Sequence, residues 1–386
     1  MLPRGRRSQS LGTAHLPRAT LSSTRAGRAR SGCGLWGVSG RQNTAFTTLA
    51  TEEDVTSTRL RRPVALASIA LVAAATLAGC AADGGTNPDS TAGPGALTAI
   101  KIGSIPVTDA AVVVLGDKQG FFKDEGLTVE FGNPAAGGSS VVAAVIAGEY
   151  EVGYSATLSV FQAVAGGNDL TMIAPASGSF DDPAKGTNDL ITSPDLGLKS
   201  AKDLEGKQVA VNAAGGFAEM LGKNAVIQAG GDPAKVQWVQ LGFPDQLPAL
   251  QSGRIQGFVA GEPFGTLARE DGEVTLTNTL YDVSPKEWLL GTWFASRAAA
   301  EKNPQLFEKI QRAINNSLKY SVEHEDQLRK IIPDFAGIDP KIADSIRLSN
   351  YATPLTLDTL QPMATAAVRT GLLAKEPDLP SLIWKP

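Results

Sequence analysis

Cysteine and histidine are scarce in this chain of 386 residues, which contains two of each. From residue 80 onward only Cys80 and His324 remain. One cysteine cannot form an internal disulfide, and a zinc site of histidine and cysteine ligands needs more than this part of the chain offers. Catalytic triads built on histidine are disfavoured too, because His324 stands in an acidic stretch typical of a solvated surface.

The apolar run at residues 64–78 is too short to cross a membrane. It has 15 residues, whereas a spanning helix needs roughly 20. Arginines within 59–62 precede it, and small residues at 78–80 follow it. A basic segment, an apolar segment and small residues at a cleavage point are, in this order, typical of a secretory signal peptide. We therefore expect residues 55–79 to direct export.

The segment before this signal has no sustained apolar period. Residues 1–54 carry eight arginines and no acidic residue before Glu52, which predicts a disordered basic tail. A signal peptide works poorly this far inside a chain, so we predict that the start codon is assigned too early and that Val55 or Leu60 is the true start. Residues 80–96 are rich in glycine, proline, serine and threonine, which predicts a flexible tether.

Basic residues are in short supply once the signal is removed. Residues 80–386 carry 24 basic and 36 acidic side chains, a net charge of −12. This balance argues against nucleic acid or an anionic membrane surface as a partner. The 307 residues that remain suit one large or two medium domains with a substantial core.

Short apolar runs alternate with amphipathic segments from residue 97 onward, which predicts an α/β fold with mostly parallel sheets and crossover helices. The order recurs in two blocks, so we expect two lobes. We assign residues 97–192 to the first part of lobe one and residues 193–290 to lobe two. Residues 291–386 return to lobe one and add C-terminal helices, expected at 298–302, 305–321, 326–332, 341–348 and 357–371.

The sequence Leu77-Ala78-Gly79-Cys80 resembles the bacterial lipoprotein box. In that family the cysteine sulfur is acylated and the cysteine becomes the new N-terminus. The resemblance implies a protein anchored through lipid on Cys80 at the extracytoplasmic face of the cell membrane. The alternative is an ordinary secretory signal with an incidental cysteine.

Six phrases between residues 97 and 373 resemble, in order and spacing, the solute-binding proteins of ABC importers, in the branch for sulfonates, taurine, nitrate and thiamine precursors. The phrases are Lys101-Ile102-Gly103 with Pro106; Gly120-Phe121-Phe122-Lys123 with Gly126-Leu127; residues 143–148 before Glu151-Val152-Gly153; Leu198-Lys199-Ser200 with residues 203–207; Ala249-Leu250-Gln251-Ser252-Gly253; and Glu262-Pro263-Phe264. The resemblance implies a type II periplasmic-binding-protein fold with a ligand cleft between its lobes. It implies a membrane permease with its ATPase as partner. We expect no cofactor or metal, since histidine and cysteine are scarce.

Candidate ligand contacts follow from the rule that ligands of open α/β sheets bind beyond the carboxyl ends of strands. Two glycine-rich turns, at 137–140 and 213–217, each open a helix, and their free N–H groups suit an oxyanion, although ordinary helix capping needs the same residues. We expect Glu262 to pair with a ligand amine, and Phe217 and Trp293 to supply apolar walls. The ligand-binding candidates are Thr108, Asp109, Ser139, Ser140, Ser155, Thr157, Gly215, Gly216, Phe217, Glu262 and Trp293.

These patterns favour a monomeric, non-enzymatic protein that captures a small sulfonate-, taurine- or nitrate-like solute. Two alternatives stay open within the same resemblance. One is a binding protein for a thiamine-pyrimidine precursor. The other is an enzyme similar to thiamine-pyrimidine synthases, which depend on metal and histidine, and the scarcity of histidine and cysteine disfavours it. A lipoprotein with a cleft that binds nothing is a further class.

Overall fold

The computed structural model describes residues 97–386. The predicted basic tail (1–54), signal peptide (55–79), lipidation site Cys80 and tether (80–96) lie outside the described residues. Across residues 97–386, none of the helices combines the length and the apolar character that a membrane span requires.

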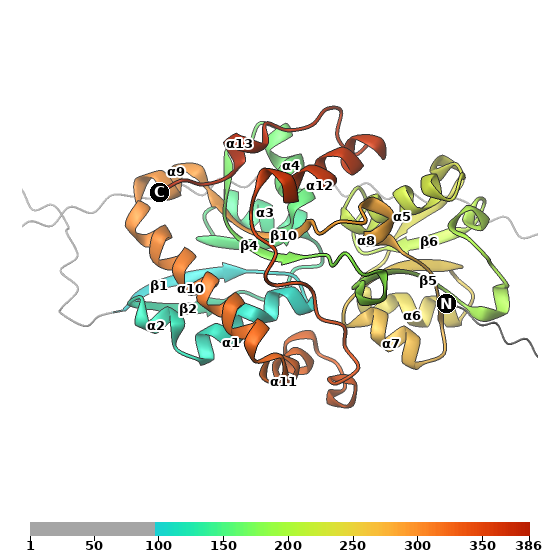
Figure 1. Ribbon diagram of the computed structural model, residues 1–386, viewed down its shortest axis with the longest axis horizontal. Coiled ribbons are helices and arrows are strands. Elements are labelled where there is room, and N and C mark those ends of the chain that lie inside the picture. Colours follow the sequence, from blue (N-terminus) through green and yellow to red (C-terminus); the bar gives the residue numbers. More distant parts are fainter. Residues whose placement is uncertain (1–96) are drawn as a thin grey trace, which may run out of the picture. The chain divides into compact units, whose positions relative to one another are not determined.

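The first sheet has five strands in the order β2-β1-β3-β10-β4 (Figure 1). Its strands are β1 (Thr98–Gly103), β2 (Leu127–Phe131), β3 (Val152–Ala156), β4 (Leu170–Gly178) and β10 (Leu289–Ser296). All five residues of the central strand β3 are buried, because helices cover both faces of the sheet. One face carries α1 (Ala111–Lys118), α2 (Phe121–Asp124), α10 (Pro304–Glu323) and α11 (Glu325–Ala336), and the other carries α3 (Gly138–Ile146) and α4 (Thr157–Ala165).

The second sheet repeats this plan in the order β7-β6-β8-β5-β9. Its strands are β5 (Asn188–Thr192), β6 (Gln208–Val211), β7 (Gln237–Gln240), β8 (Gly257–Gly261) and β9 (Val274–Asn278). One face carries α5 (Phe217–Gln228) and α8 (Thr279–Val283), and the other carries α6 (Phe243–Gln251) and α7 (Phe264–Glu270). We call each sheet with its helices a lobe, numbered as the sheets are.

In each sheet four strands run in one direction and the fifth runs against them. The reversed strands are β10, which pairs antiparallel with β3 and β4, and β5, which pairs antiparallel with β8 and β9. Each is the strand by which the chain enters a sheet after crossing from the other lobe. The predicted α/β class with mostly parallel sheets and crossover helices is confirmed, and each sheet has this one antiparallel strand in addition.

The first crossing between the lobes lies earlier than the sequence suggested. Lobe one was assigned up to residue 192, but residues 188–192 form β5 of the second sheet. The chain therefore crosses between the end of β4 and the start of β5. It was the apolar character of β5 that made it resemble a further strand of the first block.

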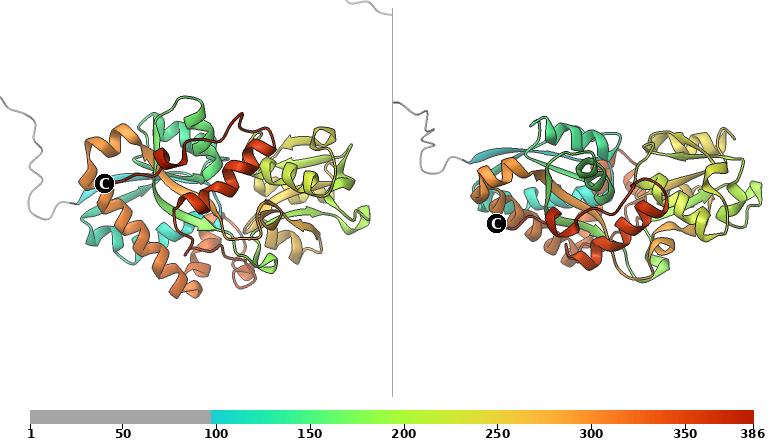
Figure 2. Two further views of the ribbon diagram at one scale, coloured as in Figure 1. Left: turned by 45° about the horizontal axis from the view of Figure 1, so that its top comes forward. Right: turned by 90° about the horizontal axis from the view of Figure 1, so that it is seen from above.

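The chain returns to lobe one with β10 and then adds helices, among them α9 (Arg297–Lys302), α12 (Leu357–Arg369) and α13 (Leu379–Leu382). Helix α12 contacts α4 of lobe one and both α5 and α8 of lobe two, and it spans the two halves in Figure 2. The helix expected at 341–348 is wrong, since only the short 3-10 turn Pro340–Ile342 forms there. Residues 337–356, which we call the return segment, are otherwise largely irregular and reach Gly178 through Asn350.

Candidate ligand-binding site

A cavity lies between the two lobes and encloses about 830 Å³ of empty space, its open mouth included. Lobe one lines it with residues that follow β1 and with the first turns of α3 and α4. Lobe two lines it with residues that follow β6 and β8, and the return segment adds Ser349. These segments lie at the carboxyl ends of parallel strands, where open α/β sheets bind ligands.

The structure brings together seven of the eleven residues that the sequence predicted for the site. These residues are Thr108, Asp109, Ser139, Gly215, Gly216, Phe217 and Glu262. Both glycine-rich turns, one from each lobe, therefore reach the same cavity.

The other four candidates do not form the cavity wall. Ser140 is exposed, whereas Ser155, Thr157 and Trp293 are fully buried. Successive residues of a strand point to opposite faces, so Tyr154 of β3 reaches the cavity while Ser155 points toward α3. Trp293 lies opposite Tyr154 on β10, and its ring packs against the tyrosine at 5.3 Å between centroids. The expectation that Trp293 forms a wall of the cleft is therefore wrong, because this side chain belongs to the core.

Asp109 is fixed at the cavity wall by hydroxyl groups from four segments. Its carboxylate accepts hydrogen bonds from Ser177 (2.6 Å), Ser349 (2.7 Å), Tyr154 (3.0 Å) and Thr108 (3.3 Å). Burial and the neighbouring Asp109 carboxylate raise the pKa of the Tyr154 phenol well above its usual value, so this phenol remains a donor. The arrangement places a carboxylate in the wall with little freedom to move.

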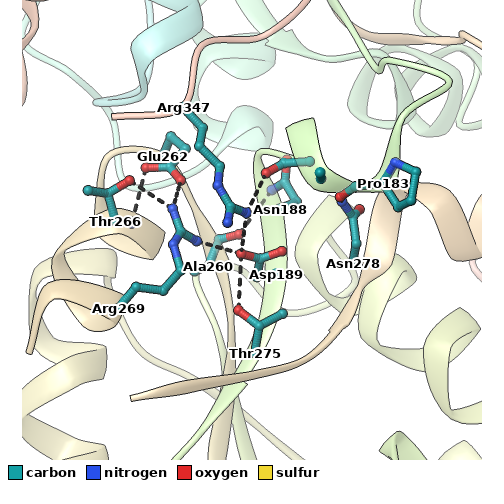
Figure 3. Close-up of polar contacts among 12 residues, drawn as sticks. Pro183, Asn188, Asp189, Ala260, Glu262, Thr266, Arg269, Thr275, Asn278 and Arg347 are labelled. Carbon is teal, nitrogen blue, oxygen red and sulfur yellow. Dashed lines mark hydrogen bonds and ion pairs between the residues drawn. The ribbon is translucent and has the colours of Figure 1, made fainter. Parts of the chain in front are cut away.

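Glu262 lines the cavity, but both of its carboxylate oxygens are held by the protein (Figure 3). One lies 2.5 Å from Arg269, and the other accepts the backbone N–H of Thr266 at 3.1 Å. Arg269 also pairs with Asp189, which in turn pairs with Arg347 of the return segment. The charge of Glu262 is thus compensated within the protein, which differs from the expectation that it faces a ligand amine.

Residues at the starts of four helices, α3, α4, α5 and α6, line the cavity, whereas the sequence suggested two. The residues that precede the first turns of α3, α4 and α5 are Gly137, Ala156 and Gly216, and none supplies a side-chain cap. Of the residues at the start of α4, the sequence analysis had proposed only Thr157 as a ligand contact. In the part of the chain that the structure describes, no lysine, arginine or histidine lines this cavity.

Two amide side chains that the sequence analysis missed join the lobes across the cavity. Gln162 of α4 donates to the carbonyl of Gly215 at 2.8 Å, and Asn212 donates to the carbonyl of Ala136 at 3.3 Å. Asn212 directly follows β6, so its position at the end of a strand could have predicted that it lies at the cavity. Gln162 lies inside a helix, and nothing in its sequence context distinguishes it from a surface residue.

A family model described as NMT1/THI5 like matches residues 107–328. A search of curated protein sequences finds no match. Among solved structures, the periplasmic aliphatic sulphonate binding protein SsuA from Escherichia coli is 18% identical, with a TM-score of 0.59 over 75% of this chain and 92% of its own.

Two further structures have similar scores. The alkanesulfonate-binding protein SsuA from Xanthomonas axonopodis pv. citri, bound to MOPS, is 16% identical, with a TM-score of 0.60 over 75% of this chain and 99% of its own. The periplasmic nitrate-binding protein NrtA from Synechocystis PCC 6803 is 14% identical, with a TM-score of 0.60 over 73% and 84%. These likenesses confirm the predicted two-lobed periplasmic-binding-protein fold.

Proposed function

Because the chain belongs to the NMT1/THI5-like family, we propose that it is the solute-binding component of an ABC importer. The observation that carries this proposal is the cavity between the lobes, whose wall combines residues from both. A ligand that contacts both lobes favours the closed form, and closure is what a membrane permease can recognise. The partners are then a permease and its ATPase, and we propose that the binding protein itself is a monomer.

We propose a small sulfonate-, taurine- or nitrate-like oxyanion as the ligand. The support is the group of helix N-termini at the cavity, because their N–H groups and partial positive charge suit an anion. The similar structures from Escherichia coli and Synechocystis are described as binding sulphonate and nitrate.

A second candidate ligand is an aminopyrimidine related to thiamine precursors. The Asp109 carboxylate and the Asn188 amide in the wall suit the amino group and ring nitrogens of such a molecule. The rings of Phe217 and Phe243 line the same cavity and offer flat apolar surface.

Binding rather than catalysis agrees with the chemistry of the wall. Ser139 and Ser159 supply hydroxyls there, but within residues 97–386 no histidine or cysteine lines the cavity to activate them. We therefore propose that the protein is not an enzyme and needs no cofactor.

We propose that the protein is exported and held by lipid on Cys80 at the extracytoplasmic face of the membrane. The motive is the sequence Leu77-Ala78-Gly79-Cys80 at the end of the apolar run. Intact-mass measurement of membrane-extracted protein tests this, and any N-terminus other than an acylated Cys80 contradicts it.

Calorimetric titration of the purified protein with ethanesulfonate, taurine, nitrate and an aminopyrimidine tests the ligand class. We expect saturable binding of at least one oxyanion, together with a rise in melting temperature, because ligands that bind only the folded state stabilise it. Binding of the aminopyrimidine alone moves the assignment to the second candidate. No binding of any of the four, at concentrations up to the millimolar range, contradicts both.

A further inference from the structure

We infer that Asp109 determines the specificity of the cavity by binding an amino group of the solute, so that oxyanions without an amino group bind poorly. The inference rests on the proposed function and narrows its ligand class. It applies to an amino sulfonate and to an aminopyrimidine alike, because both molecules carry an amino group that can donate to a carboxylate.

Asp109 leaves one negative charge in the cavity wall without a positive partner in the part of the chain that the structure describes. The other carboxylate of the wall, Glu262, belongs to a network with Arg269, Asp189 and Arg347, in which two negative and two positive charges cancel. Among the described residues no lysine, arginine or histidine lines the cavity. A wall with this charge repels a simple anion and attracts a cationic group.

The hydroxyl groups that bind Asp109 orient its carboxylate without removing its charge. Ser177 holds one oxygen at 2.6 Å, Ser349 holds the other at 2.7 Å, and the bond from Thr108 is long at 3.3 Å. A carboxylate accepts about four hydrogen bonds, so the weak bond from Thr108 can give way to one from a ligand. A carboxylate that is already fixed in place loses little freedom when the ligand binds, which favours affinity.

Asp109 lies on one side of the cavity, and the starts of α3, α4 and α5 lie on the other. The backbone N–H of Thr108 donates to the carbonyl of Glu262 at 3.3 Å, which joins the segment before α1 to the segment before α7. Helices α1 and α7 cover one face of their sheets, whereas α3, α4 and α5 cover the opposite faces (Figure 1). A solute in the cavity therefore meets the carboxylate on one side and helix N–H groups on the other, which suits a molecule with an amino group and an oxyanion at opposite ends.

An aromatic ring on the side of Asp109 adds to the preference for an amino group. Phe243, the first residue of α6, lines the cavity and stacks on Phe264 at 5.3 Å between ring centroids. Helices α6 and α7 cover the same face of the second sheet. The face of an aromatic ring attracts a cation and offers an oxyanion no hydrogen bond.

Pairs of probes that differ only at the amino group test the inference on the unaltered protein. Taurine and isethionate share a sulfonate, and an ammonium group in the first replaces a hydroxyl in the second. An aminopyrimidine and the same pyrimidine without its amino group form the other pair. We expect the amino member of at least one pair to bind about ten- to a hundredfold more tightly than its partner, the range for one hydrogen bond to a charged group.

Asp109→Asn tests the charge, because asparagine keeps the size of the side chain and one acceptor oxygen. We expect this variant to weaken binding of the preferred amino probe about ten- to a hundredfold, while binding of its partner changes by no more than about threefold. Ser177→Ala is the matched control, since it removes a hydroxyl from the carboxylate and keeps the charge. The preference for the amino probe should persist in this control even if both affinities fall.

The outcomes distinguish this inference from the proposed function. If isethionate, ethanesulfonate or nitrate binds the unaltered protein as tightly as taurine, the inference is overturned and a protein that binds oxyanions remains. An equal loss for both members of a pair in Asp109→Asn also overturns it, because Asp109 then acts only in the structure. Binding of none of the probes contradicts the inference and the proposed ligands together. Thermal unfolding shows whether each variant is folded, and the comparison within each pair needs no variant.

Discussion

At the scale of single residues, the sequence predicted which side chains line the cavity where these side chains directly follow a strand. It did not predict the role of a side chain that another residue of the protein holds by an ion pair or hydrogen bond. Thr108, Asp109 and Ser139 were found because loops after parallel strands meet at one edge of a sheet. The ion pair between Glu262 and Arg269 could not be predicted from the sequence, because it forms only when α7 places Arg269 beside Glu262. Ser155 points away from the cavity because side chains alternate along β3, and the sequence does not show which set of alternating residues faces the cavity.

The Glu262 carboxyl gives a stability prediction whose size depends on pH. Burial raises its pKa above the usual 4.5, and the pairing with Arg269 offsets this only in part. The folded state therefore holds the proton more tightly than the unfolded state. Its contribution to stability is full below the unfolded pKa and declines as the pH rises through the folded pKa. Glu262→Gln should thus reduce the free energy of unfolding more at about pH 4 than at about pH 7.

Asp203 provides a control of opposite sign. Backbone N–H groups of Lys199 and Ser200 hold the pKa of this exposed carboxyl below its usual 3.8. Asp203→Asn should therefore cost more stability near neutral pH than in acid. The contribution of Asp203 is present above its unfolded pKa and is lost as the pH falls through its folded pKa, so urea unfolding of both variants from about pH 2 to about pH 7 tests the pair. The same slope for both variants would contradict the assignment.

At the scale of elements, the bounds of helices with a regular apolar pattern were predicted within a few residues. Elements without such a pattern were not predicted correctly. The helices expected at 298–302, 305–321, 326–332 and 357–371 form as α9, α10, α11 and α12, within a few residues of these bounds. The edge strand β9 was missed, since its sequence Val-Thr-Leu-Thr-Asn is half polar and its residues are exposed or only partly buried. The helix expected at 341–348 is replaced by the return segment. There Arg347 binds Asp189 and Ser349 binds Asp109, so its side chains serve contacts between segments rather than a helix face.

The packing of α3 on β3 depends on a glycine, which gives a prediction at this scale. A Cβ atom at Gly153 would lie 2.7 Å from Phe294, 2.8 Å from Val141 and 2.9 Å from Val145. Real Cβ atoms do not approach neighbours this closely, so the helix or the sheet must shift. We expect Gly153→Ala to lower the free energy of unfolding by about 1–3 kcal/mol, the usual cost of overpacking.

Gly242 is the matched control for this substitution. A Cβ atom there would meet nothing closer than 3.7 Å, and its φ of −56° suits alanine. Gly242→Ala should change the free energy of unfolding by no more than about 0.5 kcal/mol. Denaturant unfolding decides the comparison, and equal effects of the two substitutions would show that the close packing of α3 on β3 is not the cause.

At the scale of the whole molecule, the recurrence of two βα blocks predicted the two lobes, but not the contacts that hold them together. Those contacts involve residues far apart in sequence, such as Gln162 with Gly215 and Asn212 with Ala136. Helix α12 adds a further link, because it packs on α4 and α5 together. The lobes are thus joined on one side by α12 and on the cavity side by two side-chain hydrogen bonds.

The two cavity-side hydrogen bonds join one lobe to the other, so we expect them to break if the lobes separate and to affect how long a ligand stays bound. A neutral hydrogen bond contributes about 1 kcal/mol, which corresponds to about a fivefold change in the closed-to-open equilibrium. We expect Gln162→Ala to increase the ligand dissociation rate about fivefold, and Asn212→Ala to do so less, because its bond is longer at 3.3 Å. Association rates should change little, since the open form is the one that a ligand enters.

Asn168 is the matched control, because its amide donates to the carbonyl of Ala163 within lobe one and does not bridge the lobes. Asn168→Ala should lower the melting temperature without changing the dissociation rate. Stopped-flow kinetics with the oxyanion identified by titration measures the rates, and small-angle scattering of the ligand-free variants measures opening. A dissociation rate in Gln162→Ala equal to that of the unaltered protein would show that the bond from Gln162 to Gly215 does not limit ligand release.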